Sequence, residues 1–242
     1  MGLAYGGAIV RDGLVLALDA ADRNSYPGSG TTVFDLSGDG YNGTLVNGMT
    51  FDTEAGGCFV GDGTNDNITY AATAESKGTL TNSITYECWV KRTGTSADTL
   101  PRLMSTDASD YCTLYLGSSG AGDLRWIINI GGSSRLITYD SGLVLNEWTH
   151  VVGTAEYDGS STFSQILYVN GTSVASTING SATGNWGDGT SRAFAIFANV
   201  EATVQNNNCL NGKLGPARVY NKFLTASEVL QNYNATKTRF GL

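Results

Sequence analysis

The stretch NEWTHVVGTAEYDGSSTFSQILYVNGTS, residues 146–173, decides the fold of this chain. Residues 148–157 divide by alternation between the two faces of a predicted β-strand. One face carries Thr149, Val151, Gly153, Ala155 and Tyr157, and the other carries Trp148, His150, Val152, Thr154 and Glu156. Residues 158–161, Asp-Gly-Ser-Ser, then reverse the chain, because Asp and Gly tolerate a positive φ. A second strand follows at residues 165–169.

The end of the same stretch predicts a third strand. Asn170-Gly171 is a strong hairpin signal, because both residue types adopt the positive φ that a two-residue turn requires. Residues 172–178 then return as a strand. The middle of the chain is therefore predicted to be an antiparallel meander.

The rest of the chain consists of short apolar runs separated by Gly, Asn, Asp and Ser. Glycine accounts for 32 of the 242 residues, well above its usual share of about 7%. This pattern predicts many tight turns between strands, as in an all-β sandwich. Strands are predicted at residues 14–18, 33–36, 42–45, 49–51, 58–60, 67–70, 84–92, 112–116, 124–130, 135–139, 193–199 and 210–220. A further strand is predicted to start at 103–104 and to be broken at 105–110. A polar loop is predicted at 200–208.

A helical period occurs near the C-terminus. Thr225 can cap a helix, and Glu228, three residues later, can bond back to it in a capping box. The apolar spacing that follows predicts a short helix at residues 226–235, lying against the sandwich. Residues 237–242 are predicted to be a tail that is free or bound to a partner. Since no linker divides the chain, we expect a single domain, residues 1–242.

Composition restricts the partners. The formal net charge is −8 and the isoelectric point is about 4.5. An acidic surface repels phosphate backbones, so nucleic acid is not expected as a partner. The first residues lack the basic and apolar regions of a secretory signal, and no run of 18 apolar residues predicts a membrane-spanning helix. We therefore expect no membrane insertion.

The four cysteines do not form a recognisable motif. They are Cys58, Cys88, Cys112 and Cys209, and no two have the spacing of a CxxC metal or redox site. Cys88 and Cys112 lie within apolar strands, so buried free thiols are expected. The sequence leaves disulfides open as the alternative.

Four pieces of the chain, in order, resemble the laminin-G-like (concanavalin A-like) jelly-roll family. They are ITYECWVK at 84–91, WTHVVG at 148–153, LYVNG at 167–171 and GKLGPARVYNKFLTASEV at 212–229. The resemblance covers about residues 80–235 and implies an antiparallel β-sandwich with one short C-terminal helix. It does not determine the function, because this sandwich serves lectins, adhesins, glycanases and structural proteins.

A narrower resemblance concerns the two ends of the chain. Residues 13–28 look like the start, and residues 230–240 like the end, of jelly-roll proteins encoded by tailed bacteriophages. This resemblance implies a virion structural protein: a capsid decoration, a head fibre or a tail-associated protein. Its partners would be other capsid or tail proteins, and it would be a homo-oligomer or present in many copies on the particle. The absence of a signal agrees, since virions assemble in the host cytoplasm.

The residues needed for glycan hydrolysis depart from the family pattern. Retaining β-glucanase relatives carry Glu-x-Asp-x-x-Glu on one strand, which places paired carboxylates on one face. The strand that contains Trp89 has Glu87 alone, without an acid at the paired spacing. His150 is the single histidine, and its position in a strand favours a structural role over a zinc site. We therefore assign no catalytic residue and expect a protein that is not an enzyme.

Calcium is the candidate cofactor. Calcium takes oxygen ligands from Asp, Asn and backbone carbonyl groups. Laminin-G relatives often bind calcium at the rim, and the resemblance implies Asp107 and Asp110 as ligands, with Asp188 approaching them. The alternative is that Asp side chains of such turns cap their own backbone. Two other acid-rich turns contain Asp35 with Asp39 and Asp62 with Asp66.

Sugar binding requires an exposed aromatic face beside hydrogen-bonding groups. Trp186 lies in a polar loop with Asn185 and Asp188, and Asn207 belongs to a second polar loop. These four residues are the candidate glycan contacts, and the alternative is that Trp186 packs over the edge of the sandwich. Trp126 and Trp148 lie in apolar strands and are predicted to be core residues.

These observations favour a non-enzymatic virion structural protein that displays a lectin-like domain, with weak attachment to host surface glycans. The alternative is a carbohydrate-binding lectin module without a role on a virion. A glycan-degrading enzyme is the third hypothesis.

Overall fold

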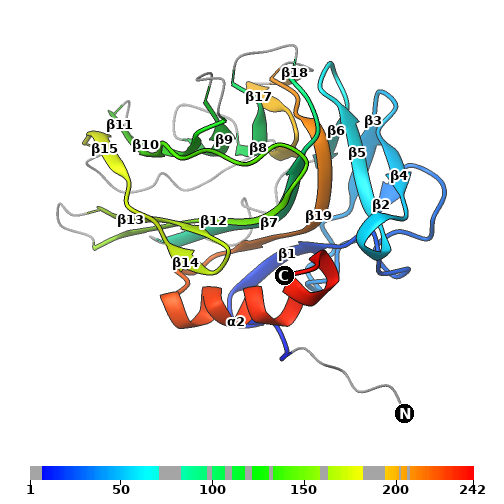
Figure 1. Cartoon of the computed structure of the whole chain (residues 1–242), viewed down its shortest axis with the longest axis horizontal. Helices are drawn as coiled ribbons and strands as arrows, with labels where there is room; N and C mark the ends of the chain where they lie inside the picture. The colour runs from blue at the N-terminus through cyan, green and yellow to red at the C-terminus, as the bar shows by residue number, and fades with distance from the viewer. Residues whose placement is uncertain are drawn as a thin grey trace.

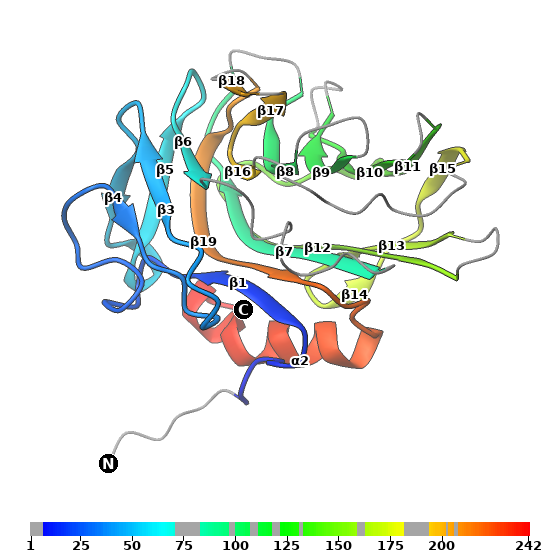
Figure 2. The ribbon, with the colours of Figure 1, turned by 180° about the vertical axis from the view of Figure 1, so that it is seen from behind.

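In the computed structural model the chain forms three layers: two β-sheets packed face to face and a helix outside one of them (Figure 1). The view from behind shows the same three layers (Figure 2). The predicted antiparallel sandwich with a short C-terminal helix is confirmed. The structure describes residues 7–70, 83–96, 100–106, 111–117, 122–130, 133–158, 163–181, 194–201, 203–205 and 208–242.

The sheet next to the helix has eight strands. Their order is β14-β13-β12-β7-β19-β5-β4, and β1 pairs with the other part of β19. The strands predicted at 84–92, 148–157 and 210–220 agree with the structure to within one residue at each end, whereas the strand predicted at 165–169 begins two residues earlier. The strands are β1 (Leu14–Leu18), β4 (Thr50–Asp52), β5 (Cys58–Asp62), β7 (Ser83–Arg92), β12 (Trp148–Tyr157), β13 (Phe163–Val169), β14 (Thr172–Ser173) and β19 (Asn211–Tyr220).

The second sheet has nine strands in the order β15-β11-β10-β9-β8-β16-β6-β3-β2. Its strands are β2 (Thr32–Val33), β3 (Gly43–Val46), β6 (Asn67–Tyr70), β8 (Arg102–Thr106), β9 (Tyr111–Leu116), β10 (Leu124–Ile130), β11 (Ser133–Tyr139), β15 (Thr177–Gly180) and β16 (Phe194–Ile196). A separate hairpin, β17 (Asn199–Glu201) with β18 (Thr203–Gln205), follows β16.

Alternation along β12 separates two hydrophobic clusters. Val151 and Ala155 face the main core between the sheets, whereas Val152 faces the smaller cluster under the helix. The inner face also requires Gly153, because a Cβ atom there would lie 2.8 Å from a ring carbon of Trp126. The two faces predicted for residues 148–157 are therefore confirmed.

The predicted third strand of the meander is wrong. After the turn at Asn170 (φ 50°) and Gly171 (φ 78°), β14 has only two residues. The chain then leaves this sheet, and β15 pairs with β11 in the opposite sheet. A hydrogen bond from Ser176 Oγ to the carbonyl oxygen of Val174 accompanies the crossing.

Three other predicted boundaries also differ. The apolar run 193–199 is not one strand, because Phe197 adopts a φ of 66° after β16. The predicted loop 200–208 contains much of the β17–β18 hairpin. Strand β8 continues through Ser105 and Thr106, since the Thr106 hydroxyl group bonds to the backbone of Cys112.

The C-terminal segment forms the third layer. Helix α2 (Ala226–Thr236) begins with the predicted capping box of Thr225 and Glu228. The tail is not free, as it forms the 3-10 helix η2 (Lys237–Phe240) and packs on its own sheet. The ring of Phe240 stacks on Trp89, with centroids 4.0 Å apart and planes 14° apart.

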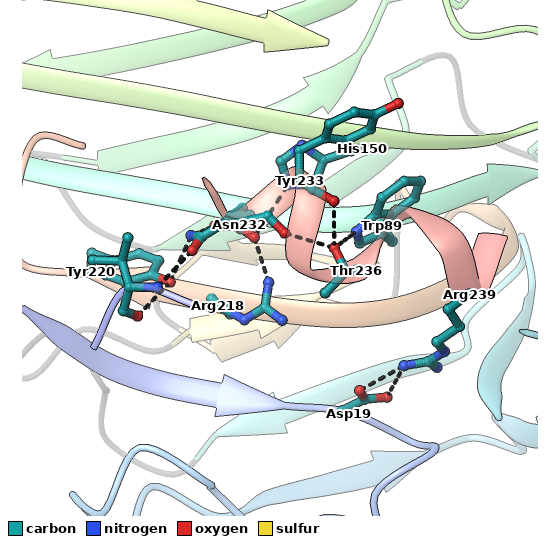
Figure 3. Close-up of polar contacts among 11 residues, drawn as sticks. Asp19, Trp89, His150, Arg218, Tyr220, Asn232, Tyr233, Thr236 and Arg239 are labelled. Carbon is teal, nitrogen blue, oxygen red and sulfur yellow. Dashed lines mark hydrogen bonds and ion pairs between the residues drawn. The ribbon is translucent and has the colours of Figure 1, made fainter. Parts of the chain in front are cut away.

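Arg239 ties this tail to the beginning of the chain. Its Nη1 lies 2.8 Å and 2.6 Å from the two carboxylate oxygens of Asp19 (Figure 3). Its Nε donates to the carbonyl oxygen of Ala55 in the 3-10 helix η1 (Glu54–Gly56). Three segments that are far apart in the sequence are therefore held together at one guanidinium group.

The four cysteines are buried thiols, as the apolar surroundings of Cys88 and Cys112 predicted. Burial raises the pKa of the Cys58 thiol to about 11, so this thiol stays protonated at neutral pH. In the part of the chain that the structure describes, no helix is long and apolar enough to cross a membrane.

We predict that Phe240→Ala lowers the free energy of unfolding by roughly 3 kcal/mol, because the ring is buried between Trp89 and Trp148. Leu242→Ala is the control, since Leu242 is 50% exposed, and we expect its effect to stay within about 0.5 kcal/mol. Urea unfolding of both variants measures the difference. Equal midpoints would show that the tail does not stabilise the fold.

Candidate functional site

The largest group of buried charged side chains lies between the eight-stranded sheet and α2. Glu87 on β7 is directly opposite Arg218 on β19, and Arg218 Nη1 donates to Glu87 Oε1. His150 Nε2 lies 3.2 Å from the same oxygen, and Asn232 Nδ2 of α2 donates to Glu87 Oε2 at 2.6 Å. We call these four residues, together with Tyr220, the Glu87 cluster (Figure 3).

Asn232 connects this cluster to the beginning of the chain. Its Nδ2 lies 2.9 Å from the hydroxyl oxygen of Tyr220, and its Oδ1 accepts the backbone N–H of Val10 at 2.8 Å. Tyr220 also donates to the carbonyl oxygen of Val10. At the end of the helix, Thr236 Oγ1 accepts the indole N–H of Trp89 at 2.8 Å (Figure 3). Helix α2 is therefore held by polar contacts as well as by apolar packing.

The Glu87 cluster does not have the access that a ligand site needs. Glu87, His150 and Asn232 have no exposed surface, and Arg218 is 6% exposed. Burial alone raises the pKa of Glu87, but the charge of Arg218 and the hydrogen bond from His150 outweigh it and hold the pKa at about 2. The carboxylate is therefore ionised and paired, and its role is structural. The structural role predicted for His150 agrees with this position.

A second ionic group lies at the edge of the same layer. Glu54 Oε1 accepts from Lys91 Nζ at 2.7 Å and from the Trp148 indole N–H at 2.8 Å, while Lys213 Nζ lies 2.8 Å from Glu54 Oε2. The hydrogen bonds from Lys213 and Lys91 lower the pKa of Glu54 to about 2. The prediction that Trp148 is a core residue is wrong, because Trp148 is half-buried under the C-terminal tail. Trp126 is fully buried, as predicted.

The opposite side of the molecule carries a different group, on strands of the nine-stranded sheet. Tyr115 on β9 pairs with Arg102 on β8 and with Arg125 on β10, so the three side chains form a row on the face away from the core. The guanidinium carbons of Arg102 and Arg125 lie 4.6 Å and 6.0 Å from the centroid of the Tyr115 ring. Arg125 Nε donates to Asp123 Oδ2 at 2.8 Å.

Two glycines make room for these charged groups. A Cβ atom at Gly117 would overlap with the Asp123 carboxylate and with Arg125 Nε. A Cβ atom at Gly122 would overlap with Arg92 Nη1, and the φ of Gly122 is +70°. Arg92 therefore reaches the same turn from the end of β7. We call Arg92, Arg102, Tyr115, Asp123 and Arg125 the arginine cluster.

The three arginines of the arginine cluster are accessible from solvent, whereas Tyr115 and Asp123 are buried. Arg92, Arg102 and Arg125 are each partly exposed, and the side chain of Arg125 is 26% exposed. Burial alone lowers the pKa of Arg125, but the hydrogen bond and charge of Asp123 outweigh it and raise the pKa. The guanidinium group thus remains charged. This group is the candidate functional site within the described residues, because accessible guanidinium donors lie beside a buried carboxylate and a buried aromatic ring that hold them in place.

All of the site residues singled out in the sequence lie outside the described residues. This applies to the glycan contacts and the calcium ligands: Trp186, Asn185, Asp188, Asn207, Asp107 and Asp110. Those assignments stay predictions. Among the described residues, no three His, Cys, Asp or Glu side chains lie close enough together to hold a metal ion.

In the two other acid-rich turns, Asp side chains cap the backbone, which is the alternative to calcium binding that the sequence left open. Asp35 accepts backbone N–H groups from Ala17, Ser37, Gly40 and Tyr41. Asp62 accepts the backbone N–H of Thr64 at 2.7 Å. Asp carboxylates that cap their own turns in this way have fewer free oxygen atoms for a cation.

Sequence reasoning missed both clusters. A signal for the Glu87 cluster was present, since Asn232 lies three residues after Val229, on the apolar face of a helix. For the arginine cluster the signal was weaker. Arg125 alternates with core residues, but the positions of Tyr115 and Arg102 beside it depend on strand register.

We predict that Arg218→Met lowers the free energy of unfolding by about 3–5 kcal/mol, because it leaves the Glu87 carboxylate buried without its main partner. The double variant Glu87→Leu/Arg218→Met should lose less than the sum of the single variants. Lys222→Met is the control, as it breaks exposed ion pairs with Asp12 and Glu228 and should lose less than about 1 kcal/mol. Additive losses in the double variant would contradict the coupling.

We also predict that acid destabilises the fold through Glu87. Its pKa is about 2 in the folded chain and 4.5 for an ordinary glutamate, so the folded state binds fewer protons between these values. The stabilisation is complete above about pH 4.5 and is lost as the pH falls toward about 2. Urea unfolding across this range should give a smaller pH dependence for Glu87→Gln than for the unchanged chain. Identical pH dependences would show that Glu87 is not the group involved.

Comparison with known proteins places the fold. A family model described as the concanavalin A-like lectin/glucanases superfamily matches residues 62–230. No curated protein matches the chain.

Solved structures with this fold include toxin and glycosidase domains. The botulinum neurotoxin serotype D binding domain has a TM-score of 0.65 at 15% identity, covering 93% of this chain and 52% of that chain. The serotype D ligand binding domain in complex with N-acetylneuraminic acid has a TM-score of 0.63 at 15% identity, and the match covers 93% of this chain and 51% of that chain. Domain 4 of a GH43 extracellular arabinanase from Geobacillus stearothermophilus, in complex with arabinotriose, has a TM-score of 0.59 at 17% identity. The match covers 91% of this chain and 98% of that chain.

At these identities the structural likeness concerns the fold alone. The chain spans about half the length of the neurotoxin binding domains that it matches. The family model covers more than half of the chain and includes the three central strands of the eight-stranded sheet. The chain therefore belongs to the concanavalin A-like lectin/glucanases superfamily.

Proposed function

We propose that this chain is a non-enzymatic, lectin-like domain that binds glycans with the side of the molecule opposite to α2. The observation that carries this proposal is the contrast between the two sides. Helix α2 and the Glu87 cluster occupy one side, whereas the other presents the partly exposed arginines of the arginine cluster, which lie beside the buried Tyr115 ring. Partly exposed guanidinium groups can donate hydrogen bonds to the hydroxyl and carboxylate oxygen atoms of a sugar. Relatives in complex with N-acetylneuraminic acid and with arabinotriose add support.

The ionic state of Glu87 and Glu54 does not suit either of these two glutamates to acid catalysis of glycan hydrolysis. A glycosidase needs one carboxyl group whose pKa is raised, so that it can act as a general acid. The pKa values of Glu87 and Glu54 are both lowered to about 2, by partners that hold the charged form. Neither glutamate has the protonation state that an acid catalyst requires near neutral pH.

We further propose that the domain is displayed on a phage particle, as a capsid decoration, a head fibre or a tail-associated protein. The support is the resemblance of residues 13–28 and 230–240 to the ends of phage jelly-roll proteins. In this fold the two segments meet: Arg239 pairs with Asp19, and α2 lies beside β1. A layer built from both segments on one side would leave the arginine cluster facing away from the particle.

A carbohydrate-binding module without a role on a virion is the second candidate. The arabinanase domain favours it, because that domain is covered over 98% of its length by a match to this chain. Such a module would share the glycan site and lack partners on a particle.

The first test is a glycan array probed with the purified chain, with and without calcium. We expect binding, and Trp186→Ala should reduce it if the predicted loop contacts the sugar. Phe34→Ala is the matched control, since it removes an aromatic ring that is 42% exposed. A loss of binding in chelator would support the calcium ligands predicted at Asp107, Asp110 and Asp188. The absence of any glycan binding would refute the lectin function.

The virion role has a separate test. The chain should be found in stoichiometric amounts on purified phage particles and should sediment with them. A chain that is absent from particles but binds glycans would favour the carbohydrate-binding module instead.

A further inference from the structure

We propose that the arginine cluster binds the anionic group of an acidic glycan, either the carboxylate of an acidic sugar or a sulfate ester. This inference rests on the proposed glycan-binding function and specifies its ligand. Arg92, Arg102 and Arg125 provide the donors, and Asp123 and Tyr115 orient them.

The charge of the cluster is opposite to that of the chain. The chain has a formal net charge of −8, with 14 Lys and Arg against 22 Asp and Glu. The cluster nevertheless contains three guanidinium groups and one carboxylate. Two other arginines have evident structural partners, as Arg218 does in Glu87 and Arg239 does in Asp19. A positive group on an acidic, solvent-accessible surface attracts an anion and disfavours a cation.

The geometry holds the guanidinium groups in place before a ligand arrives. Arg125 is fixed by its Nε bond to Asp123, and Arg102 is fixed over the Tyr115 ring at 4.6 Å. A guanidinium group that is already oriented loses less side-chain entropy when it binds. Its planar fork matches a carboxylate or sulfate with two parallel hydrogen bonds. The cluster is therefore suited to a small oxyanion attached to a sugar.

Arg92 gives the cluster a hydrogen-bond donor that has no other partner among the described residues. Its Nε is buried and has no hydrogen-bond partner in the described part of the chain, while the residue as a whole is partly exposed. Its Nη1 lies against the backbone at Gly122, directly before Asp123. A buried donor without a partner is costly, and an anion or an ordered water molecule would satisfy it.

The experiment compares matched glycans by calorimetry at low salt. The probes are lactose, 3′-sialyllactose and 3′-sulfolactose, which share a neutral part and differ in the anionic group. We expect at least one acidic probe to bind about tenfold or more tightly than lactose, because a hydrogen bond to a charged group contributes on this scale. The preference should decrease as salt is added. The two acidic probes distinguish a carboxylate from a sulfate ligand.

Variants locate the site. Arg102→Gln and Arg125→Gln should each remove most of the preference for the acidic probe, about tenfold, with binding of lactose unchanged. Arg23→Gln is the matched control, because it removes the same charge from an exposed loop. Arg92→Gln is added because Arg92 forms no ion pair in the described structure, so this variant should fold even if Arg125→Gln does not.

Three other results would contradict the anionic ligand, the location of the site or the glycan-binding function. Equal binding of acidic and neutral probes would refute the anionic ligand and leave the lectin function intact. An acidic preference that persists in all three arginine variants would refute this location. Binding of no glycan on the array or in calorimetry would refute the proposed function together with the inference.

Discussion

The carboxylate of Glu87 is the constraint on which the helix side of this molecule depends. A charged group without exposed surface is stable only when its partners are fixed, because the interior does not replace the lost hydration. Those partners come from β19, β12 and α2, through Arg218, His150 and Asn232. The same carboxylate thus specifies how two neighbouring strands and the C-terminal helix are placed relative to β7.

The apolar contacts around Glu87 follow from this placement. Asn232 binds Glu87 through its amide nitrogen and binds Val10 through its amide oxygen, so the beginning of the described chain is fixed by the same residue. Once α2 is positioned, η2 brings Phe240 onto Trp89. The eight-stranded sheet is consequently covered on both faces, and two of the three arginines of the arginine cluster, Arg102 and Arg125, lie on the other sheet.

Membership of the concanavalin A-like superfamily determines the scaffold and leaves the ligand to individual side chains. In this chain the arginine cluster is built mainly on three adjacent strands, β8, β9 and β10, and Arg92 reaches it from the end of β7. Sites on strands are held more precisely than sites on loops, because the sheet fixes the backbone on both sides. Glycines at 117 and 122 are part of the arrangement, since any larger residue would displace the charged side chains.

The sequence by itself determined the strands with a clear period of two, the capping box at Thr225 and Glu228, and the inward face of β12, because these depend on neighbouring residues. Only the tertiary structure decided where residues 174–180 cross between sheets, that Phe240 stacks on Trp89, and which charges meet. Arg218 is 131 residues from Glu87, and Tyr115 reaches Arg102 through strand register. Contacts between distant segments depend on sheet order and register, which local propensity does not encode.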